Sequence, residues 1–346
     1  MKNMSDTQIP SKESKNQTLL LVEGTHEKGV LLKIILKCFP ELPIDLNNVH
    51  VYASDIYDLY HAIEKEYDED WYETENEINI PLIISRKLNI FPVLDKRKFT
   101  NIILIFDYER HDNWYSDEKI IRMQEHFVSP SDDGILYINY PMIESYQHMN
   151  IIPDPDYLNR FVPITCNPGS IYKNLVHEKS VIWGYLSSYD AMSRKLFECV
   201  PEIDQESLTD ALDQVLSLSD EELLLVQTDN ILQKVVFDKK MRKTLSYRFR
   251  HMILKLGYTN DKLSFWMALR NIFCYIINQN IIKAWKLQES KIVAPEKCIK
   301  DMYLEMDLKK VLLVQNEASA DPEIGIIWVL CTCVMFLGEY KFFWNV

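Results

Sequence analysis

The sequence predicts an α/β protein, in which a Rossmann-like, mostly parallel sheet flanked by helices is followed by an α-helical C-terminal domain. Three apolar runs of the kind that forms buried strands lie in the first half of the chain, within residues 19–22, 102–106 and 134–145. From residue 171 onward, apolar residues recur with helical spacing. We therefore expect a sheet domain over residues 17–165 and a helical domain over residues 166–346.

The first apolar run ends in a turn that suits a binding site. Glu23 follows the run directly, and Gly24 permits a tight turn without a side-chain clash. Thr25 is placed to cap a following helix, whose first turn contains Glu27. Both glutamates therefore leave the carboxyl end of a strand, where open α/β sheets bind their ligands.

Acidic residues also follow the other two runs. Asp107 and Glu109 come after the second run, and they should converge because alternate residues of an extended segment point to the same side. Glu144 lies just past the third run. Clustered carboxylates repel one another unless a cation lies among them, and oxygen ligands suit Mg²⁺ or Mn²⁺. The pattern indicates a site for one or two such ions.

The segments between these runs predict further elements around the sheet. Residues 49–52 form a short strand, after which Asp55 either joins the acidic site or caps the next helix. Residues 63–79 carry eight acidic residues against one lysine, as in a solvated surface or in a partner-docking surface that exposes Trp71 and Tyr72. An amphipathic helix over residues 81–94 belongs to an insertion around 63–98 that covers the sheet.

Composition restricts the classes of protein that fit. With 346 residues, 47% of them hydrophobic, the chain is able to build two cores. Its net charge of -13 argues against a general nucleic-acid coat, so any nucleic-acid contact must be local. The seven scattered cysteines fit a reducing cytoplasm. Residues 1–16 are polar, and we expect a flexible leader rather than a signal peptide.

A basic segment in the helical half stands out in so acidic a chain. Residues 234–251 interleave cations with Phe237, Tyr247 and Phe249, which suits a phosphate backbone and stacked bases. Alternatively, the cations pair with the acidic 63–79 run, within the chain or across a dimer. The candidate substrate-binding cations of this segment are Lys239, Lys240, Arg242, Lys243, Arg248 and Arg250.

Other patterns in the chain predict structural roles. Residues 149–170 are rich in proline and read as a connection between domains, and His148 reads as a surface partner of Glu144. Ser219 opens a capping box, and residues 264–285 form a helix that is apolar around most of its circumference. Residues 324–338 are too short to span a membrane and predict a buried helix or a dimer contact, with Cys331 and Cys333 packed in the core.

Together, these acidic turns resemble a known family. The Val22-Glu23-Gly24 turn, the acid pair at Asp107 and Glu109, and the segment 141–145 are similar to Toprim domains. Toprim domains are the metal-dependent catalytic modules of topoisomerases, bacterial primases and several nucleases. The Glu23 to Glu27 spacing is most similar to the OLD-type nucleases, and the length and helical second half resemble the PARIS-type nuclease effectors. The likeness covers residues 17–165.

The resemblance implies roles for individual residues. Glu23 would be the general acid or base, while Glu27, Asp107 and Glu109 would hold the metal and Glu144 would support them. Lys173 would contact the leaving phosphate. Arg110, next to the acid pair, either contacts the scissile phosphate or lies in an exposed basic loop. The chain departs from the family at Glu109, where Toprim domains usually have aspartate.

These observations lead to two hypotheses of different kinds. The first is a cytoplasmic, Mg²⁺- or Mn²⁺-dependent endonuclease that cleaves tRNA or DNA. The resemblance further implies a homodimer that is the toxic effector of anti-phage defence, held inactive by an ABC-like or AAA ATPase partner. The second is a catalytically degenerate Toprim module that serves as a binding or regulatory subunit of a defence complex, which Glu109 and the negative net charge favour. Saturable Mg²⁺ or Mn²⁺ binding distinguishes the two.

Overall fold

The computed structural model describes residues 17–73, 77–166, 169–290 and 297–345, so the leader expected at 1–16 lies outside it. Within this part of the chain, a six-stranded sheet has the order β2-β1-β3-β5-β4, and a sixth strand, β8, also pairs with β5. Its strands are β1 (Gln17–Val22), β2 (Val49–Val51), β3 (Phe99–Asp107), β4 (Val128–Ser129), β5 (Gly134–Tyr140) and β8 (Leu330–Cys331). The predicted mostly parallel sheet is confirmed.

The strand order explains where the carboxyl ends meet. β1 pairs in parallel with β2 on one side and with β3 on the other, and β3 pairs in parallel with β5. The chain therefore builds outward from β1 in both directions, which creates a switch point between β1 and β3. Val22 is in register with Ile105, so these two strands end side by side. β4 and β8 run antiparallel to β5.

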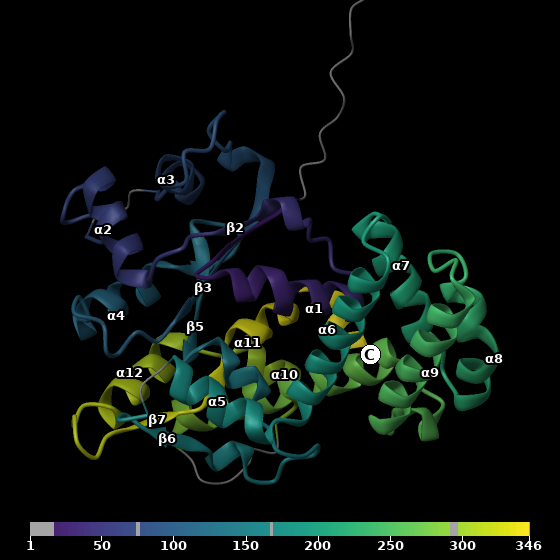
Figure 1. The fold of residues 1–346 in the computed structure, drawn as a ribbon. Helices are drawn as coiled ribbons and strands as arrows, with labels where there is room; N and C mark the ends of the chain where they lie inside the picture. Colours follow the sequence, from purple (N-terminus) through teal and green to yellow (C-terminus); the bar gives the residue numbers. More distant parts are fainter. Residues whose placement is uncertain (1–16, 74–76, 167–168, 291–296, 346) are drawn as a thin grey trace, which may run out of the picture.

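Helices from the first half cover this sheet (Figure 1). They are the π-helical η1 (Glu27–Leu32), which continues into α1 (Lys33–Cys38), α2 (Ile56–Tyr67), α3 (Ile80–Lys87) and α4 (Asp117–His126). The helix predicted over 81–94 is shorter than expected, because Asn79 caps α3 at its start and the helix ends at Lys87. Asp55 caps α2 by accepting a hydrogen bond from the Asp58 N–H at 2.8 Å, as the second of its two interpretations proposed.

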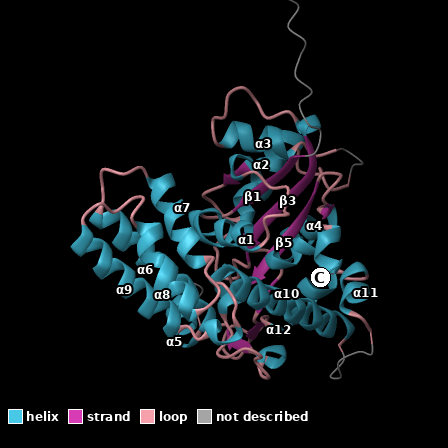
Figure 2. Cartoon of the chain, turned by 90° about the vertical axis from the view of Figure 1, so that its right-hand side faces the viewer, coloured by secondary structure: helices cyan, strands magenta, loops and turns pink. Residues whose placement is uncertain are grey.

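The second half is largely helical, as predicted. Figure 2 shows α6 to α9 gathered on one side of the sheet. The helices are α5 (Ser170–Lys179), α6 (Val181–Cys199), α7 (Gln205–Leu216), α8 (Glu221–Leu232), α9 (Lys239–Lys255), α10 (Phe265–Glu289), α11 (Ile299–Leu304) and α12 (Leu308–Ala318). Apolar residues around α10 are buried because it packs against α1, α11 and α12. Asp220, rather than Ser219, caps α8, so the predicted capping box is wrong by one residue.

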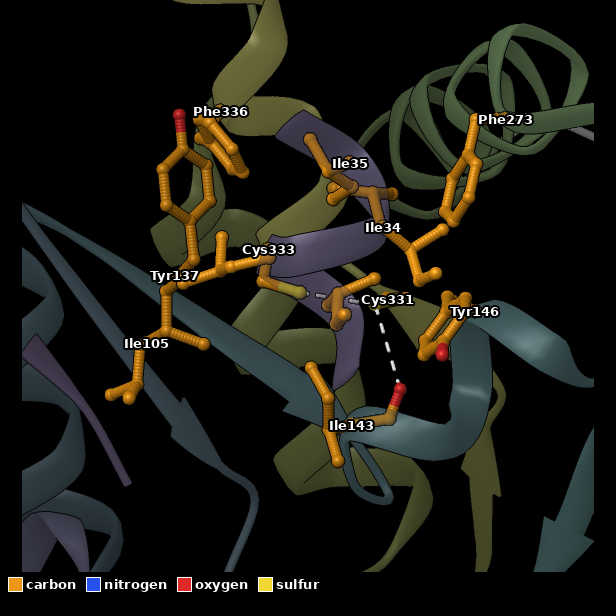
Figure 3. Close-up of a cluster of buried hydrophobic side chains, with 14 of the residues drawn as sticks. Ile34, Ile35, Ile105, Tyr137, Ile143, Tyr146, Phe273, Cys331, Cys333 and Phe336 are labelled. Atoms are coloured by element: carbon orange, nitrogen blue, oxygen red, sulfur yellow. Dashed lines mark hydrogen bonds between the residues drawn. The ribbon is translucent and has the colours of Figure 1, made fainter. Parts of the chain in front are cut away.

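The C-terminal segment is not the helix predicted over 324–338. It forms β7 (Ile326–Trp328), which pairs with β6 (Phe161–Pro163), then β8 and the 3₁₀ segment η7 (Cys333–Glu339). The segment is buried as expected, but as an added strand and turn on the main sheet. Cys331 and Cys333 lie in the apolar cluster of Figure 3 as free thiols, which confirms core packing. The chain beyond residue 165 therefore completes the N-terminal sheet.

Short 3₁₀ segments connect the main elements. They are η2 (Leu46–Asn48), η3 (Lys96–Lys98), η4 (Ile143–Gln147), η5 (Tyr157–Asn159), η6 (Tyr258–Asp261) and η8 (Lys341–Asn345). The proline-rich connection is fastened to α10, because the buried Lys283 Nζ donates to the backbone oxygens of Tyr157 at 2.8 Å and Arg160 at 2.7 Å. In the part of the chain that the structure describes, no helix is long and apolar enough to cross a membrane.

Two side chains predicted at the surface are buried instead. Trp71, within the acidic run, is 0% exposed and packs on Tyr60 and on His126, so the premise of an exposed docking tryptophan is wrong. Residues 74–76 of that run lie outside the described residues. His148 is also buried, and it pairs with the Tyr172 hydroxyl at 3.1 Å rather than lying on the surface. In both cases a distant element covers a side chain that looks exposed from its neighbours in sequence.

Candidate metal centre

Three carboxylates meet at the switch point between β1 and β3. One oxygen from each of Glu23, Asp107 and Glu109 lies within 4.8 Å of the other two. Asp107 is buried, while Glu23 and Glu109 are half-buried. The backbone forms this arrangement, because the Glu23 N–H donates to the Ile105 oxygen at 3.1 Å and continues the pairing of β1 with β3. The acidic residues expected to converge at the strand ends do so, with Glu23 rather than Glu27 in the closest set.

Hydrogen bonds fix the positions of these side chains. The backbone N–H of Asp107 donates to Glu23 Oε2 at 2.9 Å, which holds the glutamate against the end of β3. Between the two acids, Tyr108 is buried and its hydroxyl donates to Asn316 Oδ1 at 2.8 Å. This anchor ties the turn after β3 to α12. The acid pair is therefore held from both the sheet and the helical half.

The pKa values of all three carboxylates are raised, because burial and mutual repulsion disfavour their ionised forms. Burial raises the pKa of Glu23 to about 8, and the charges of Glu109, Glu27 and Asp55 add to the rise, while the Asp107 N–H opposes it. Burial also raises the pKa of Asp107 well above its usual range, and neighbouring carboxylates raise it further. The pKa of Glu109 is raised by burial and by Asp55, with a hydrogen bond to Glu23 acting against it. A bound cation would reverse these shifts.

The donor chemistry fits a hard divalent cation. All three groups of the closest set are carboxylates, and no nitrogen or sulfur ligand belongs to it. Oxygen-only sets of this kind suit Mg²⁺ or Mn²⁺ and not the softer metals that prefer thiolate or imidazole. The arrangement is thus a candidate metal centre.

Glu27, a metal ligand by the resemblance, lies outside the closest set, although its charge still acts on Glu23 and Asp107. Its buried carboxylate accepts a hydrogen bond from the Gly24 N–H at 3.1 Å, so it caps the turn before η1. Thr25, predicted to cap this helix, already lies in a helical turn. A Cβ at Gly24 would lie 2.9 Å from Glu27 Oε2, so a larger residue there would shift the Glu27 carboxylate. Burial raises the pKa of Glu27, and the charge of Glu144 raises it further.

Glu144 and Lys173 form an ion pair beside this set. Their atoms Oε1 and Nζ are 3.0 Å apart, and Glu144 is 1% exposed whereas Lys173 is 40% exposed on α5. The other oxygen of Glu144, Oε2, is buried without a hydrogen-bond partner. The charges of this pair also affect the pKa values of His26 and His177, which burial lowers. The sequence-predicted residues 144 and 173 are therefore brought together, and a role for Lys173 at a phosphate remains a prediction.

Sequence reasoning missed one residue of the site, Asn139. Its side-chain Nδ2 donates to Asp107 Oδ1 at 3.3 Å, and its Oδ1 accepts from the Cys333 N–H at 3.2 Å. Cys331 Sγ lies 3.4 Å from the same Oδ1. The C-terminal segment thereby fixes the orientation of the Asn139 amide, so that its NH₂ group faces Asp107. Asn139 is a single amide side chain inside the apolar run of residues 134–140. Because a buried polar group requires a partner, this position could have indicated a contact with the acidic site.

The structure places the remaining candidate residues elsewhere. Arg110 is held by Ser319, whose Oγ accepts from its Nε at 3.2 Å, and its guanidinium lies over the Tyr115 ring at 4.1 Å. Arg242 is buried and pairs with Asp229 of α8 at 3.2 Å, so it serves the fold. Arg250 is half-buried and donates to a backbone oxygen of its own helix.

The four other candidate cations of α9 form an exposed stripe. Within the described chain none of them makes an ion pair, so the pairing with the acidic 63–79 run inside one chain is not found there, and pairing across a dimer remains a prediction. Phe237 and Tyr247 are 74% and 66% exposed beside them, whereas Phe249 is buried. The stripe consists of Lys239, Lys240, Lys243 and Arg248.

No protein-family model, curated protein or solved structure matches the chain. Support for a function therefore comes from the fold, from the carboxylate set and from the resemblance carried by the acidic turns.

Proposed function

We propose that the protein is a divalent-metal-dependent phosphodiesterase of the Toprim type that acts as an endonuclease on nucleic acid. The observation that carries the proposal is the convergence of Glu23, Asp107 and Glu109 within 4.8 Å at the switch point of a mostly parallel sheet. Stability alone does not explain it, because burial and mutual repulsion disfavour ionised carboxylates there.

Each residue of the site has a chemical task in this proposal. Asp107 and Glu109 hold Mg²⁺ or Mn²⁺, and Asn139 orients the Asp107 carboxylate. The bound cation supplies charge neutralisation at the phosphate and a more acidic water. Glu23, with a pKa of about 8 before the cation binds, is suited to carry a proton near neutral pH. Glu144 and Lys173 lie at the side, where Lys173 remains partly exposed.

The stripe on α9 supports nucleic acid as the substrate. The stripe makes no ion pair with the described residues, and exposed Phe237 and Tyr247 flank it, a combination that favours phosphates and bases. In a chain with a net charge of -13, this local positive surface is suited to attract a polyanion. On the strength of the family resemblance, we extend the proposal to a homodimeric toxic effector that cleaves tRNA or DNA when an ATPase partner releases it.

Cleavage and metal binding test the proposal together. Purified wild type, Asp107→Asn and the control Glu222→Gln, an exposed carboxylate on α8, are incubated with total tRNA, single-stranded DNA and plasmid, with Mn²⁺ or with a chelator. We expect Mn²⁺-dependent cleavage by the wild type and the control only. Calorimetric titration should show a saturable Mn²⁺ site that Asp107→Asn lacks. A wild type without such a site would instead support the degenerate binding subunit.

A further inference from the structure

A cavity of about 290 Å³ lies between the helix that follows β1 and the helix α6. This volume is near the lower end of the range for small-molecule sites, about 300 Å³. Its walls are aliphatic and aromatic, and they include Val30, Ile34, Trp183, Leu186 and Tyr189. A flat apolar ring is a suitable occupant, since aromatic walls favour stacking.

One wall of the cavity is formed by the helical segment that begins just after Glu23. His26 lines it, and the next residue, Glu27, adds its charge to those of Glu23 and Asp107. The Trp183 ring is held in place because it stacks on His177 with 3.7 Å between the ring centroids and 7° between the planes. To reach this cavity, a strand whose phosphate lies at the carboxylates would have to place a base along the first turns of the helix that follows β1.

The charges at the cavity favour an occupant with a phosphate. Lys37 pairs with Asp213, and Asp190 pairs with Arg194 at 2.9 Å, so these charges are compensated. Lys33 is exposed at the cavity and makes no ion pair with the described part of the chain. An uncompensated lysine beside an aromatic wall matches a nucleotide better than it matches an apolar side chain of a protein.

We propose that this cavity receives an unpaired nucleobase of the substrate, so that the protein acts on single-stranded segments of nucleic acid. The inference rests on the proposed nuclease function. A base stacked in a duplex is not available to a side cavity, whereas a base in a loop or a single strand is readily splayed out.

Gly29 offers a way to close the cavity without disturbing the fold. It lines the cavity on η1, and a Cβ added there would meet no atom within 4 Å. Gly29→Leu therefore fills the cavity mouth, and leucine also favours a helix more than glycine does. Gly184 is the matched control, because it too is a helical glycine with nothing within 4 Å of an added Cβ, and it does not line the cavity.

The test measures how base removal affects binding. Wild type, Gly29→Leu and Gly184→Leu are titrated in a chelating buffer with a labelled single strand of about 12 nucleotides, long enough to cover one binding groove. The same strand with an abasic linker at each position in turn, and the matching duplex, are the comparison probes. Melting temperatures of all three proteins confirm that the variants are folded.

We expect an abasic linker at one position to weaken wild-type binding by about 5- to 150-fold, the range for one stacked base. Gly29→Leu should bind the intact strand with a similar loss and no longer respond to the linker, while Gly184→Leu behaves as the wild type. If the wild type does not respond to the linker, or if Gly29→Leu still does, the cavity does not hold a base.

Mn²⁺-dependent cleavage, measured in parallel, separates the two proposals. Wild-type cleavage without any response to the abasic linker would refute the cavity proposal alone and leave the cavity to another occupant, such as a partner protein. Absence of both cleavage and strand binding, in a folded protein released from any partner, would refute the nuclease function and the cavity proposal with it.

Discussion

Glu23→Gln should make the metal-free protein more stable at neutral pH while removing its activity. The pKa of Glu23 is raised from 4.5 to about 8 by burial and by neighbouring carboxylates. Folding therefore favours the protonated form, and the free energy of unfolding that this group contributes is fully present below pH 4.5. It is lost progressively as the pH rises through 8. Glutamine mimics the protonated acid and does not titrate.

The expected size follows from the linkage of proton binding to folding. Between pH 5 and pH 7 the unfolded Glu23 is largely ionised and the folded one is protonated, so each pH unit costs the wild type about 1.4 kcal/mol. Over two units, the stability of the wild type should fall by about 3 kcal/mol relative to Glu23→Gln. Saturating Mn²⁺ should stabilise the wild type more than the variant, because a cation held by Asp107 and Glu109 would also relieve the cost of ionising Glu23 in the folded state.

Urea denaturation in a chelating buffer at several pH values measures this difference. Subtracting the free energy of unfolding of the variant from that of the wild type cancels the titration of groups outside the carboxylate set. The reasoning is refuted if the difference between the two proteins stays constant from pH 5 to pH 7, because Glu23 would then be no more buried or repelled in the folded state than in the unfolded chain. It is also refuted if Mn²⁺ stabilises both proteins equally.

Three further predictions concern the surroundings of the site. Asn139→Leu removes the donor to Asp107 and leaves the Cys333 N–H without its acceptor, so it should weaken Mn²⁺ binding by about 10- to 100-fold in calorimetry. Burial lowers the pKa of His148 from 6.5 to about 4, so stability is fully present above pH 6.5 and should fall by up to about 3 kcal/mol as the pH drops to 4, a loss that urea denaturation should not show in His148→Gln. Arg242→Leu should destabilise the protein by about 2 kcal/mol in the same assay, whereas Lys243→Gln should leave stability unchanged and reduce the salt dependence of strand binding.

The parts of the fold that local chemistry determines could be predicted from the sequence. The apolar runs before Glu23 and Asp107 form β1 and β3, because a strand buried on both faces needs apolar residues at every position. Parallel pairing then brings the ends of those strands together. The convergence of acids at one edge of the sheet follows from these two rules, without knowledge of any other contact.

The spacing of the acidic residues in the sequence does not determine which glutamate joins Asp107 and Glu109. Glu23 and Glu27 both follow the end of β1, so from the sequence alone either is a candidate ligand. In the structure the Asp107 N–H binds Glu23, whereas the Gly24 N–H binds Glu27. The Glu27 bond is local, whereas the Glu23 bond spans 84 residues and depends on the register of β1 against β3, which is a tertiary property.

Contacts between distant segments account for the errors. Trp71 lies in an acidic run, yet α4 covers it through His126. The apolar segment near the C-terminus reads as a helix by length, but β5 offers it a pairing edge, and burial of its backbone requires those hydrogen bonds. That same pairing brings Cys333 to Asn139, and so the last part of the chain orients the ligand at the end of β3. The hydrogen bonds around Asp107 are consequently complete only when the C-terminal segment has joined the sheet, which a truncation at residue 165 would prevent.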